Sequence, residues 1–148
     1  MDIQNFYKLF LKCNKVTIDS RKIQQGDVFF AFSGENFNAA TLAEDAIAKG
    51  ALAVIVEQEA YAKPEKNIFY TESTLEFLQN LAKLHRSHLK IPIIGLTGSN
   101  GKTTTKELIS TVLEQKYRVQ YTFGNLNNHI GVPLTLLSIR PEHEIAVV

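Results

Sequence analysis

The sequence predicts an α/β fold with mostly parallel sheets. Short apolar runs that are typical of buried strands alternate along the chain with segments that have helical spacing of apolar residues. The stretch from Ile91 to Lys106 also reads, in order, as a strand, a glycine-containing loop, a Lys-Thr pair and a helix, which is the order of a phosphate-binding P-loop. We therefore expect a small N-terminal α/β domain followed by the first part of a Rossmann-like P-loop domain.

The first part of the chain supplies the strands and helices of the N-terminal domain. Asp2 can cap a helix whose apolar residues recur every three to four positions. Apolar runs predict strands at 16–19, 28–32, 51–56 and 67–71. One helix lies before Gly50, a residue type that commonly ends helices, and another begins at the capping-box pair Ser73 and Glu76 and continues to about Leu89.

The second part begins at Pro92 and is organised around the P-loop. The pattern predicts a strand at 91–96, a helix that ends near Tyr117, a strand at 119–123, an amide-rich loop at 124–133, a helix at 134–139 and a strand at 145–148. We expect the last strand to lie beside the P-loop strand. The parallel sheet of this second part would need more elements to cover both of its faces. We therefore expect two domains, residues 1–89 and residues 90–148, the second of them truncated.

Composition excludes several classes of protein. The 148 residues carry 16 basic and 15 acidic side chains, which offers no electrostatic footprint for nucleic acid. Cys13 is the single cysteine, so we expect no disulfide within the chain and a buried or half-buried thiol. No apolar run reaches the roughly 18 residues of a membrane span, and the N-terminus lacks the basic start of a secretory signal. These features predict a cytoplasmic protein with no membrane span.

The loop after the first P-loop strand carries the residues that suit a nucleoside triphosphate. Glycines let the backbone N–H groups turn toward phosphates, and the helix that follows presents its positive end to the anion. The predicted ATP-binding residues are Thr97, Gly98, Ser99, Asn100, Gly101, Lys102, Thr103 and Thr104. We expect Lys102 to neutralise the β- and γ-phosphates and Thr103 to ligate Mg²⁺, and we assign the catalytic role to these two residues.

The spacing of this loop departs from the common G-x-x-x-x-G-K-[ST] pattern, which would place a glycine at Leu96. The alternative is a glycine-rich turn with an incidental lysine. The strand and the helix that the motif requires are both present, which favours the P-loop.

Three further groups of polar residues are weaker candidates. Ser20 and Arg21 follow a strand and could bind a polar ligand, although on composition alone a solvated turn is the better explanation. The amide-rich loop holds Asn125, Asn127 and Asn128, whose donors and acceptors suit either substrate recognition or turn formation. His85 and His88 have the spacing of a metal pair on a helix, but with no third ligand nearby we expect a solvated helix end.

Several stretches together resemble the Mur ligases, the ATP-dependent amide-bond-forming enzymes of peptidoglycan synthesis. The variant loop at 97–104 is similar to the P-loop of that family, which accounts for the missing glycine. The segments at 17–21, 26–29 and 34–37 resemble the N-terminal domain of the members that add the third residue or the terminal dipeptide. The segment at 124–135 is similar to the form found in the member that adds the dipeptide.

The resemblance implies substrates and cofactors. The N-terminal domain would hold the UDP end of UDP-N-acetylmuramoyl-tripeptide through Ser20, Arg21 and Asn36, and the amides Asn125, Asn127 and Asn128 would contact substrate. ATP, with Mg²⁺, would phosphorylate the terminal carboxylate of the tripeptide, and the amine of D-alanyl-D-alanine would attack the acyl phosphate.

The sequence departs from the family pattern in two places. Asn38-Ala39-Ala40 replaces an expected Asp-containing step after Phe37, and no acidic metal ligand, modified lysine or C-terminal domain follows the strand at 145–148. The alternatives are another P-loop amide ligase or kinase, against which the N-terminal segments and the asparagine-rich loop argue, and a non-enzymatic nucleotide-sugar-binding module.

Overall fold

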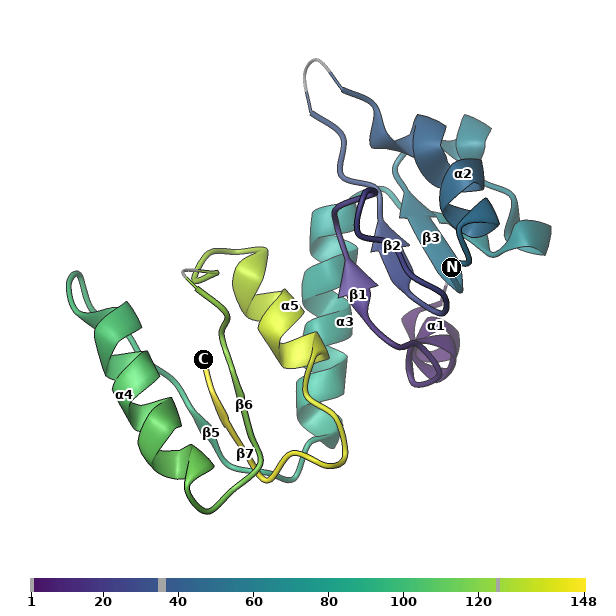
Figure 1. The fold of residues 1–148 in the computed structure, drawn as a ribbon. Helices are drawn as coiled ribbons and strands as arrows, with labels where there is room; N and C mark the ends of the chain where they lie inside the picture. The colour runs from purple at the N-terminus through teal and green to yellow at the C-terminus, as the bar shows by residue number, and fades with distance from the viewer. Residues whose placement is uncertain (1, 35–36, 125) are drawn as a thin grey trace. The chain divides into compact units, whose positions relative to one another are not determined.

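The computed structural model describes residues 2–34, 37–124 and 126–148 (Figure 1). Contacts between residues divide the chain into two compact units, Met1–Leu81 and Ala82–Val148. Helix α3 (Thr74–His88) crosses this division and contributes residues to both units. The domain boundary expected between residues 89 and 90 stays a prediction, because a compact unit is not by itself a separately folding domain.

The first unit is built on a fully parallel sheet of four strands. These are β1 (Val16–Thr17), β2 (Val28–Phe30), β3 (Ala53–Val56) and β4 (Ile68–Tyr70), and they lie in the order β1-β2-β3-β4. Each neighbouring pair is parallel, with Val28 opposite both Val16 and Ala53. The α/β prediction is confirmed for this unit, with shorter strands than the apolar runs suggested.

Both faces of this sheet are covered, so successive strand residues enter different layers of the core. Phe30 packs toward Phe77 of α3, with the ring centroids 6.2 Å apart, and Phe6 of α1 (Ile3–Phe10) lies 5.3 Å from the same ring. Phe29 points to the other face, where it joins the alanines of α2 (Ala43–Ala48). Three short 3₁₀ helices complete the unit: η1 (Ala39–Leu42), η2 (Glu59–Tyr61) and η3 (Pro64–Lys66).

The predicted helix caps of the first unit are present. The Asp2 carboxylate accepts from the backbone N–H groups of Gln4 and Asn5 at 3.3 and 3.1 Å. Ser73 Oγ accepts from Glu76 N at 3.2 Å, as the capping box requires. Glu57 adds a cap that the sequence pattern did not reveal, since its Oε1 accepts from the N and Oγ1 of Thr74 at 2.7 and 2.8 Å.

The second unit holds a parallel sheet of three strands, in the order β5-β7-β6. The strands are β5 (Ile93–Ile94), β6 (Val119–Tyr121) and β7 (Ile145–Val147). Ile93 lies opposite Ala146, so the prediction that the last strand lies beside the P-loop strand is confirmed. Helices α4 (Lys102–Glu114) and α5 (Gly131–Leu137) lie on opposite sides of this sheet (Figure 1).

Helix α5 begins at Gly131, whereas the sequence predicted a start at Leu134. Pro133 lies in the first turn, where a missing N–H costs no helical hydrogen bond. Asn128 caps this turn, because its Oδ1 accepts from the N–H groups of Ile130 and Gly131 at 3.1 and 2.7 Å. Pro133 is therefore a residue of the first turn of α5.

His85 is buried, which corrects the expectation of a solvated helix end. Its side chain is only 6% exposed, and Nε2 lies 3.0 Å from the carbonyl oxygen of Ile139. A carbonyl can only accept, so this ring nitrogen carries the proton. Burial lowers the pKa of His85, which favours the neutral imidazole. His88 does lie at the exposed helix end, where Nδ1 is 2.8 Å from the carbonyl oxygen of Leu84.

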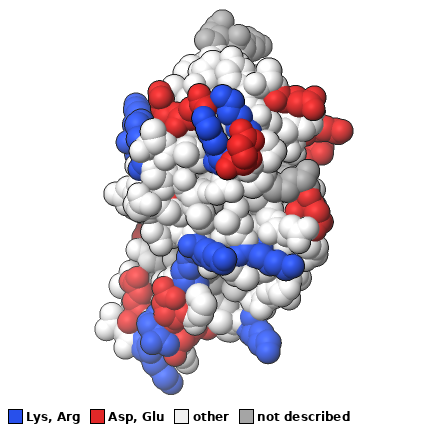
Figure 2. Space-filling view, turned by 90° about the vertical axis from the view of Figure 1, so that its right-hand side faces the viewer, with Lys and Arg blue, Asp and Glu red and all other residues white. Residues whose placement is uncertain are grey.

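Basic and acidic side chains are interspersed on the face of the molecule that Figure 2 shows. In the first unit, Glu44 Oε1 accepts hydrogen bonds from the Nζ atoms of Lys63 and Lys66 at 2.9 and 2.7 Å. These hydrogen bonds, that from Lys66 foremost, lower the pKa of Glu44 to about 2. Among the described helices, none combines the length and the apolar composition that a membrane span requires.

Candidate functional site

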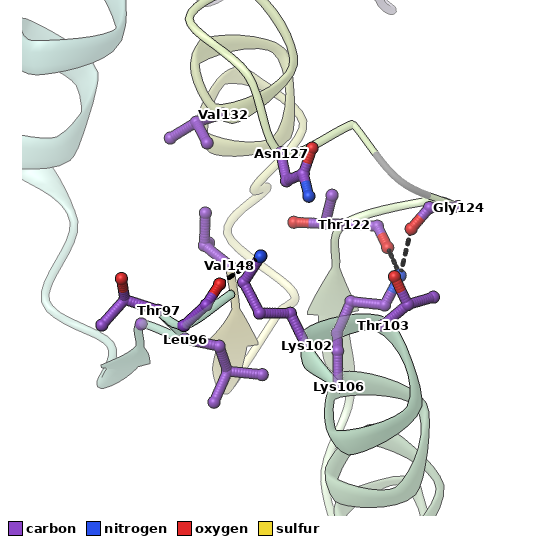
Figure 3. A pocket seen from close by; sticks show the side chains of 12 residues that line it. Leu96, Thr97, Lys102, Thr103, Lys106, Thr122, Gly124, Asn127, Val132 and Val148 are labelled. Atoms are coloured by element: carbon purple, nitrogen blue, oxygen red, sulfur yellow. Dashed lines mark hydrogen bonds between the residues drawn. The ribbon is translucent and has the colours of Figure 1, made fainter. Parts of the chain in front are cut away.

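A pocket of about 610 Å³ lies at the carboxyl ends of the three strands of the second unit. Backbone hydrogen bonds join the strand ends beside the pocket. Leu96 N donates to Val148 O at 2.8 Å, and Thr122 N donates to Val147 O at 3.0 Å. This edge is where open parallel sheets bind ligands. The lining residues are Gly95, Leu96, Thr97, Gly98, Lys102, Thr103, Lys106, Thr122, Gly124, Asn127, Val132 and Val148 (Figure 3).

The loop between β5 and α4 has the backbone conformation of a phosphate-binding turn. Gly98 and Gly101 have φ angles of +144° and +78°, values that side chains disfavour. Gly101 is the N-cap of α4 and provides no side-chain hydrogen bond to the first turn. The N–H groups at the start of the helix thus have no side-chain cap, and the helix dipole favours negative charge there.

Lys102 and Thr103 open α4 and both line the pocket, as do Thr97 and Gly98. The Lys102 ammonium donates a hydrogen bond to the carbonyl oxygen of Gly98 and so lies over the loop (Figure 3). Ser99, Asn100, Gly101 and Thr104 belong to the same loop and first turn without being lining residues. The loop therefore brings a cation, hydroxyl groups and helix N–H groups to one space.

The oxygen donors of the pocket suit Mg²⁺ only as a partner of phosphates. Among the side chains of the described lining residues, the oxygens are hydroxyl and amide oxygens, and there is no carboxylate side chain. Mg²⁺ usually keeps several waters and binds through substrate phosphates and a small number of protein oxygens. Thr103 fits the role of one such oxygen, and no group of three or more His, Cys, Asp or Glu side chains in the described parts of the chain could form a metal site of its own.

Lys106 is a pocket residue to which the sequence analysis assigned no role. Its side chain is buried, and Nζ donates to the carbonyl oxygens of Thr122 and Gly124 at 2.5 and 2.6 Å (Figure 3). Glu107 Oε1 lies 3.0 Å from the same nitrogen. An ammonium group has three donors, so these three oxygens satisfy it. Lys106 thereby fixes the chain that follows β6 against α4.

The structure, rather than the apolar pattern of the sequence, reveals this role, because Leu108 and Val112 of that pattern are 64% and 71% exposed. Lys106 and Ser110 occupy the stripe of α4 that faces the sheet, where helical periodicity would ordinarily place apolar residues. A lysine on a buried stripe indicates a specific partner, because burial of an unpaired ammonium is costly. The identity of the partners could not be predicted, since Thr122 and Gly124 lie 16 and 18 residues away in sequence.

The predicted amide residues of the loop after β6 differ in their surroundings. Asn127 lines the pocket, whereas the side-chain oxygen of Asn128 caps α5. Asn125, like Asn36, lies outside the described residues. Gly131 is required next to this cap, because a Cβ there would collide with the backbone of Leu126. The assignment of these asparagines to substrate binding stays a prediction.

Ser20 and Arg21 belong to the first unit and follow β1. Arg21 forms a bidentate pair with Asp19, from Nε to Oδ1 and from Nη2 to Oδ2, each at 2.9 Å. The hydrogen bonds from Arg21 lower the pKa of Asp19 to about 2. Lys49 Nζ donates to the carbonyl oxygen of Ser20 at 3.3 Å, which places a second cation at this strand end.

Known proteins resemble this chain along most of its length. The Mur ligase family, catalytic domain, matches residues 12–86, and the Mur ligase middle domain matches residues 96–148. The UDP-N-acetylmuramoyl-tripeptide–D-alanyl-D-alanine ligase of Bacillus subtilis (strain 168) is 44% identical over 133 residues, which is 89% of this chain and 29% of that protein. The chain thus spans less than a third of the length of this relative.

Solved structures give the same result for the fold. The MurF ligase of Thermotoga maritima, solved in complex with ADP, matches with a TM-score of 0.76 and 34% identity, over 93% of this chain and 32% of that one. A MurF structure from Acinetobacter baumannii matches with a TM-score of 0.79 and 32% identity, over 99% of this chain and 34% of that one. The resemblance seen in the sequence is confirmed, and the chain belongs to the Mur ligase family.

Proposed function

We propose that this chain forms part of an ATP-dependent ligase that joins D-alanyl-D-alanine to UDP-N-acetylmuramoyl-tripeptide in peptidoglycan synthesis. The observation that carries the proposal is the P-loop pocket at the carboxyl ends of β5, β6 and β7, in a chain of the Mur ligase family. The name of the Bacillus subtilis relative supports this choice of substrates. We expect the enzyme in the cytoplasm, where ATP is available.

The pocket would bind the triphosphate of ATP. In this arrangement the N–H groups at the start of α4 contact phosphate oxygens, and the Lys102 ammonium moves from the Gly98 carbonyl to the β- and γ-phosphates. Mg²⁺ would neutralise phosphate charge, with the Thr103 hydroxyl as its protein ligand. Thr97, Ser99, Asn100 and Thr104 would complete the nucleotide contacts from the same loop and first turn.

The proposed reaction has two steps. A carboxylate oxygen of the tripeptide attacks the γ-phosphorus, and the bond from that phosphorus to ADP breaks. The amine of D-alanyl-D-alanine then attacks the acyl carbon, the bond to the phosphate oxygen breaks, and the nitrogen loses a proton. The residues of this chain would contribute by holding the phosphates in position and by stabilising negative charge as it moves.

The first unit would bind the UDP portion of the peptide substrate. The cations of Arg21 and Lys49 at the end of β1 suit a diphosphate, and the Ser20 side chain adds a hydroxyl group. Asp19 uses two of the five guanidinium N–H donors of Arg21, which orients the group and leaves others for a ligand. We include Asn36 among the contacts by resemblance to the family.

Turnover by the natural protein that carries this chain tests the proposal. The assay supplies ATP, Mg²⁺, UDP-N-acetylmuramoyl-tripeptide and D-alanyl-D-alanine, and follows both phosphate release and the new amide bond. Lys102→Ala should lower turnover by about 100-fold or more, because it removes charge stabilisation of the transferred phosphoryl group. The control is Lys116→Ala, which removes an exposed lysine beyond the end of α4. Near-normal ATP-dependent ligation by Lys102→Ala would rule out the assignment.

A further inference from the structure

The side-chain hydroxyl is the one polar group of Thr122 that makes no hydrogen bond among the described residues. Thr122 N donates to Val147 O at 3.0 Å, and Thr122 O accepts from Lys106 Nζ at 2.5 Å. The residue is only 5% exposed, and its Oγ1 has no hydrogen-bond partner among the described residues. A buried hydroxyl without a partner is costly and needs an explanation.

The location of Thr122 supplies that explanation. The residue lines the 610 Å³ pocket from the end of β6, across from the P-loop. Figure 3 shows Thr122, Asn127 and Lys102 around the same space. The main chain of Thr122 is held on both sides, by Val147 and by Lys106, so the position of the residue and the direction of its Cα–Cβ bond are fixed. This is the arrangement of a preorganised ligand contact.

The charge of the pocket indicates which ligand atom this hydroxyl meets. Lys102 and the N-terminus of α4 make the pocket favourable for anions, and its described lining residues include no Asp or Glu. A hydroxyl can donate or accept, and next to an oxyanion it donates.

We propose that Thr122 is a ligand-binding residue whose hydroxyl group donates a hydrogen bond to an oxyanion oxygen in the P-loop pocket. The oxygen belongs either to the terminal phosphate of the nucleotide or to the carboxylate that receives the phosphoryl group. This inference rests on the proposed function, and it extends the binding site from the P-loop to the end of β6. Lys106 acts as the positioning residue, since it holds the Thr122 carbonyl.

Two substitutions separate this role from a structural one. Thr122→Val keeps the shape of the side chain and removes the hydroxyl group, whereas Thr122→Ser keeps the hydroxyl group. Ser110→Ala is the matched control, because Ser110 is 1% exposed, also has an Oγ without a partner among the described residues, and is not a lining residue of the pocket. Removal of an unsatisfied buried hydroxyl leaves the fold as stable or stabilises it, so neither Thr122→Val nor Ser110→Ala should lower the melting temperature.

The experiment uses the natural protein that carries this chain. Calorimetry measures its dissociation constants for Mg·ADP, for a non-hydrolysable Mg·ATP analogue, and for UDP-N-acetylmuramoyl-tripeptide in the presence of Mg·ADP. Thr122→Val should weaken binding about 10-fold or more in the ATP-analogue arm if the phosphate is the partner, or in the tripeptide arm if the carboxylate is. Thr122→Ser and Ser110→Ala should bind like the unchanged chain.

Three results would overturn the inference: unchanged affinity of Thr122→Val in every arm, an equal loss in Ser110→Ala, or a loss in Thr122→Val with a lower melting temperature that Thr122→Ser shares. Failure of the natural protein without substitutions to bind nucleotide would instead contradict the proposed function itself, so the two failures are distinguishable.

Discussion

At the scale of single residues, two lysines one turn apart on α4 have different surroundings. Lys102 opens the helix and lies over the P-loop, and its position follows from the local motif. Lys106 is buried against the carbonyl groups of Thr122 and Gly124. The sequence could predict the first because every residue of its motif is nearby. It could not predict the second, because the partners come from a strand end that only the fold brings close.

His85 provides a prediction about pH at this scale. Its pKa in the folded protein is below the usual 6.5 because of burial, so the unfolded chain takes up a proton at a higher pH than the folded one. The stability that the neutral imidazole provides is therefore complete above pH 6.5 and is lost as pH falls toward the folded pKa. One proton corresponds to a slope of at most about 1.4 kcal/mol per pH unit in the free energy of unfolding.

Urea unfolding between pH 7.5 and 5.5 checks this expectation. His85→Gln can still donate to the carbonyl oxygen of Ile139 and does not titrate, so its stability should fall less steeply than that of the unchanged chain. His129→Gln removes an exposed histidine of the loop before α5 and should leave the slope unchanged. Equal slopes for the unchanged chain and His85→Gln would contradict the account.

At the scale of elements, the sequence predicted each strand of the second unit and the helix after the P-loop, but it placed the start of α5 three residues late. The apolar stripe from Leu134 onward was visible in the sequence. The first turn was not, because it depends on Asn128 turning its side chain back to Ile130 and Gly131. An asparagine-rich segment reads equally well as a ligand-binding loop or as a cap.

Neighbouring asparagines should separate these two roles. Asn128→Ala removes the cap of α5 and should lower the free energy of unfolding by about 1 kcal/mol. In Asn128→Asp the side chain can still accept hydrogen bonds from the same N–H groups, so the free energy of unfolding should fall less than in Asn128→Ala. Asn127→Ala changes an exposed residue that lines the pocket, so stability should be unchanged. Thermal and urea unfolding of the three variants provide the measurement, and a loss of stability in Asn127→Ala equal to that in Asn128→Ala would contradict this division.

At the scale of the whole molecule, the sequence predicted the fold class, the parallel pairing and the adjacency of β5 and β7. These features follow from patterns that extend over many residues, such as the alternation of strands and helices. The environments of individual side chains were harder to predict from the sequence. His85 is buried against Ile139, although the sequence favoured a solvated helix end. Arg21 is exposed at the turn after β1, where its bidentate pair with Asp19 could not be read from composition.

The central claim is that the two units bind different substrates of one reaction. The second unit binds ATP at the P-loop, and the first unit binds a UDP-linked precursor at the end of β1. Amide NMR spectra of the chain, titrated separately with Mg·ATP and with UDP-N-acetylmuramoyl-tripeptide, test it most directly.

ATP should shift the signals of residues 97–105 and 122–124 in a saturable way, and Lys102→Ala should weaken this response. The UDP-linked precursor should shift residues 18–22, with a weaker response in Arg21→Ala than in the control Lys12→Ala. Saturable ATP binding that leaves residues 97–105 unshifted, or that is identical in Lys102→Ala, would contradict the account.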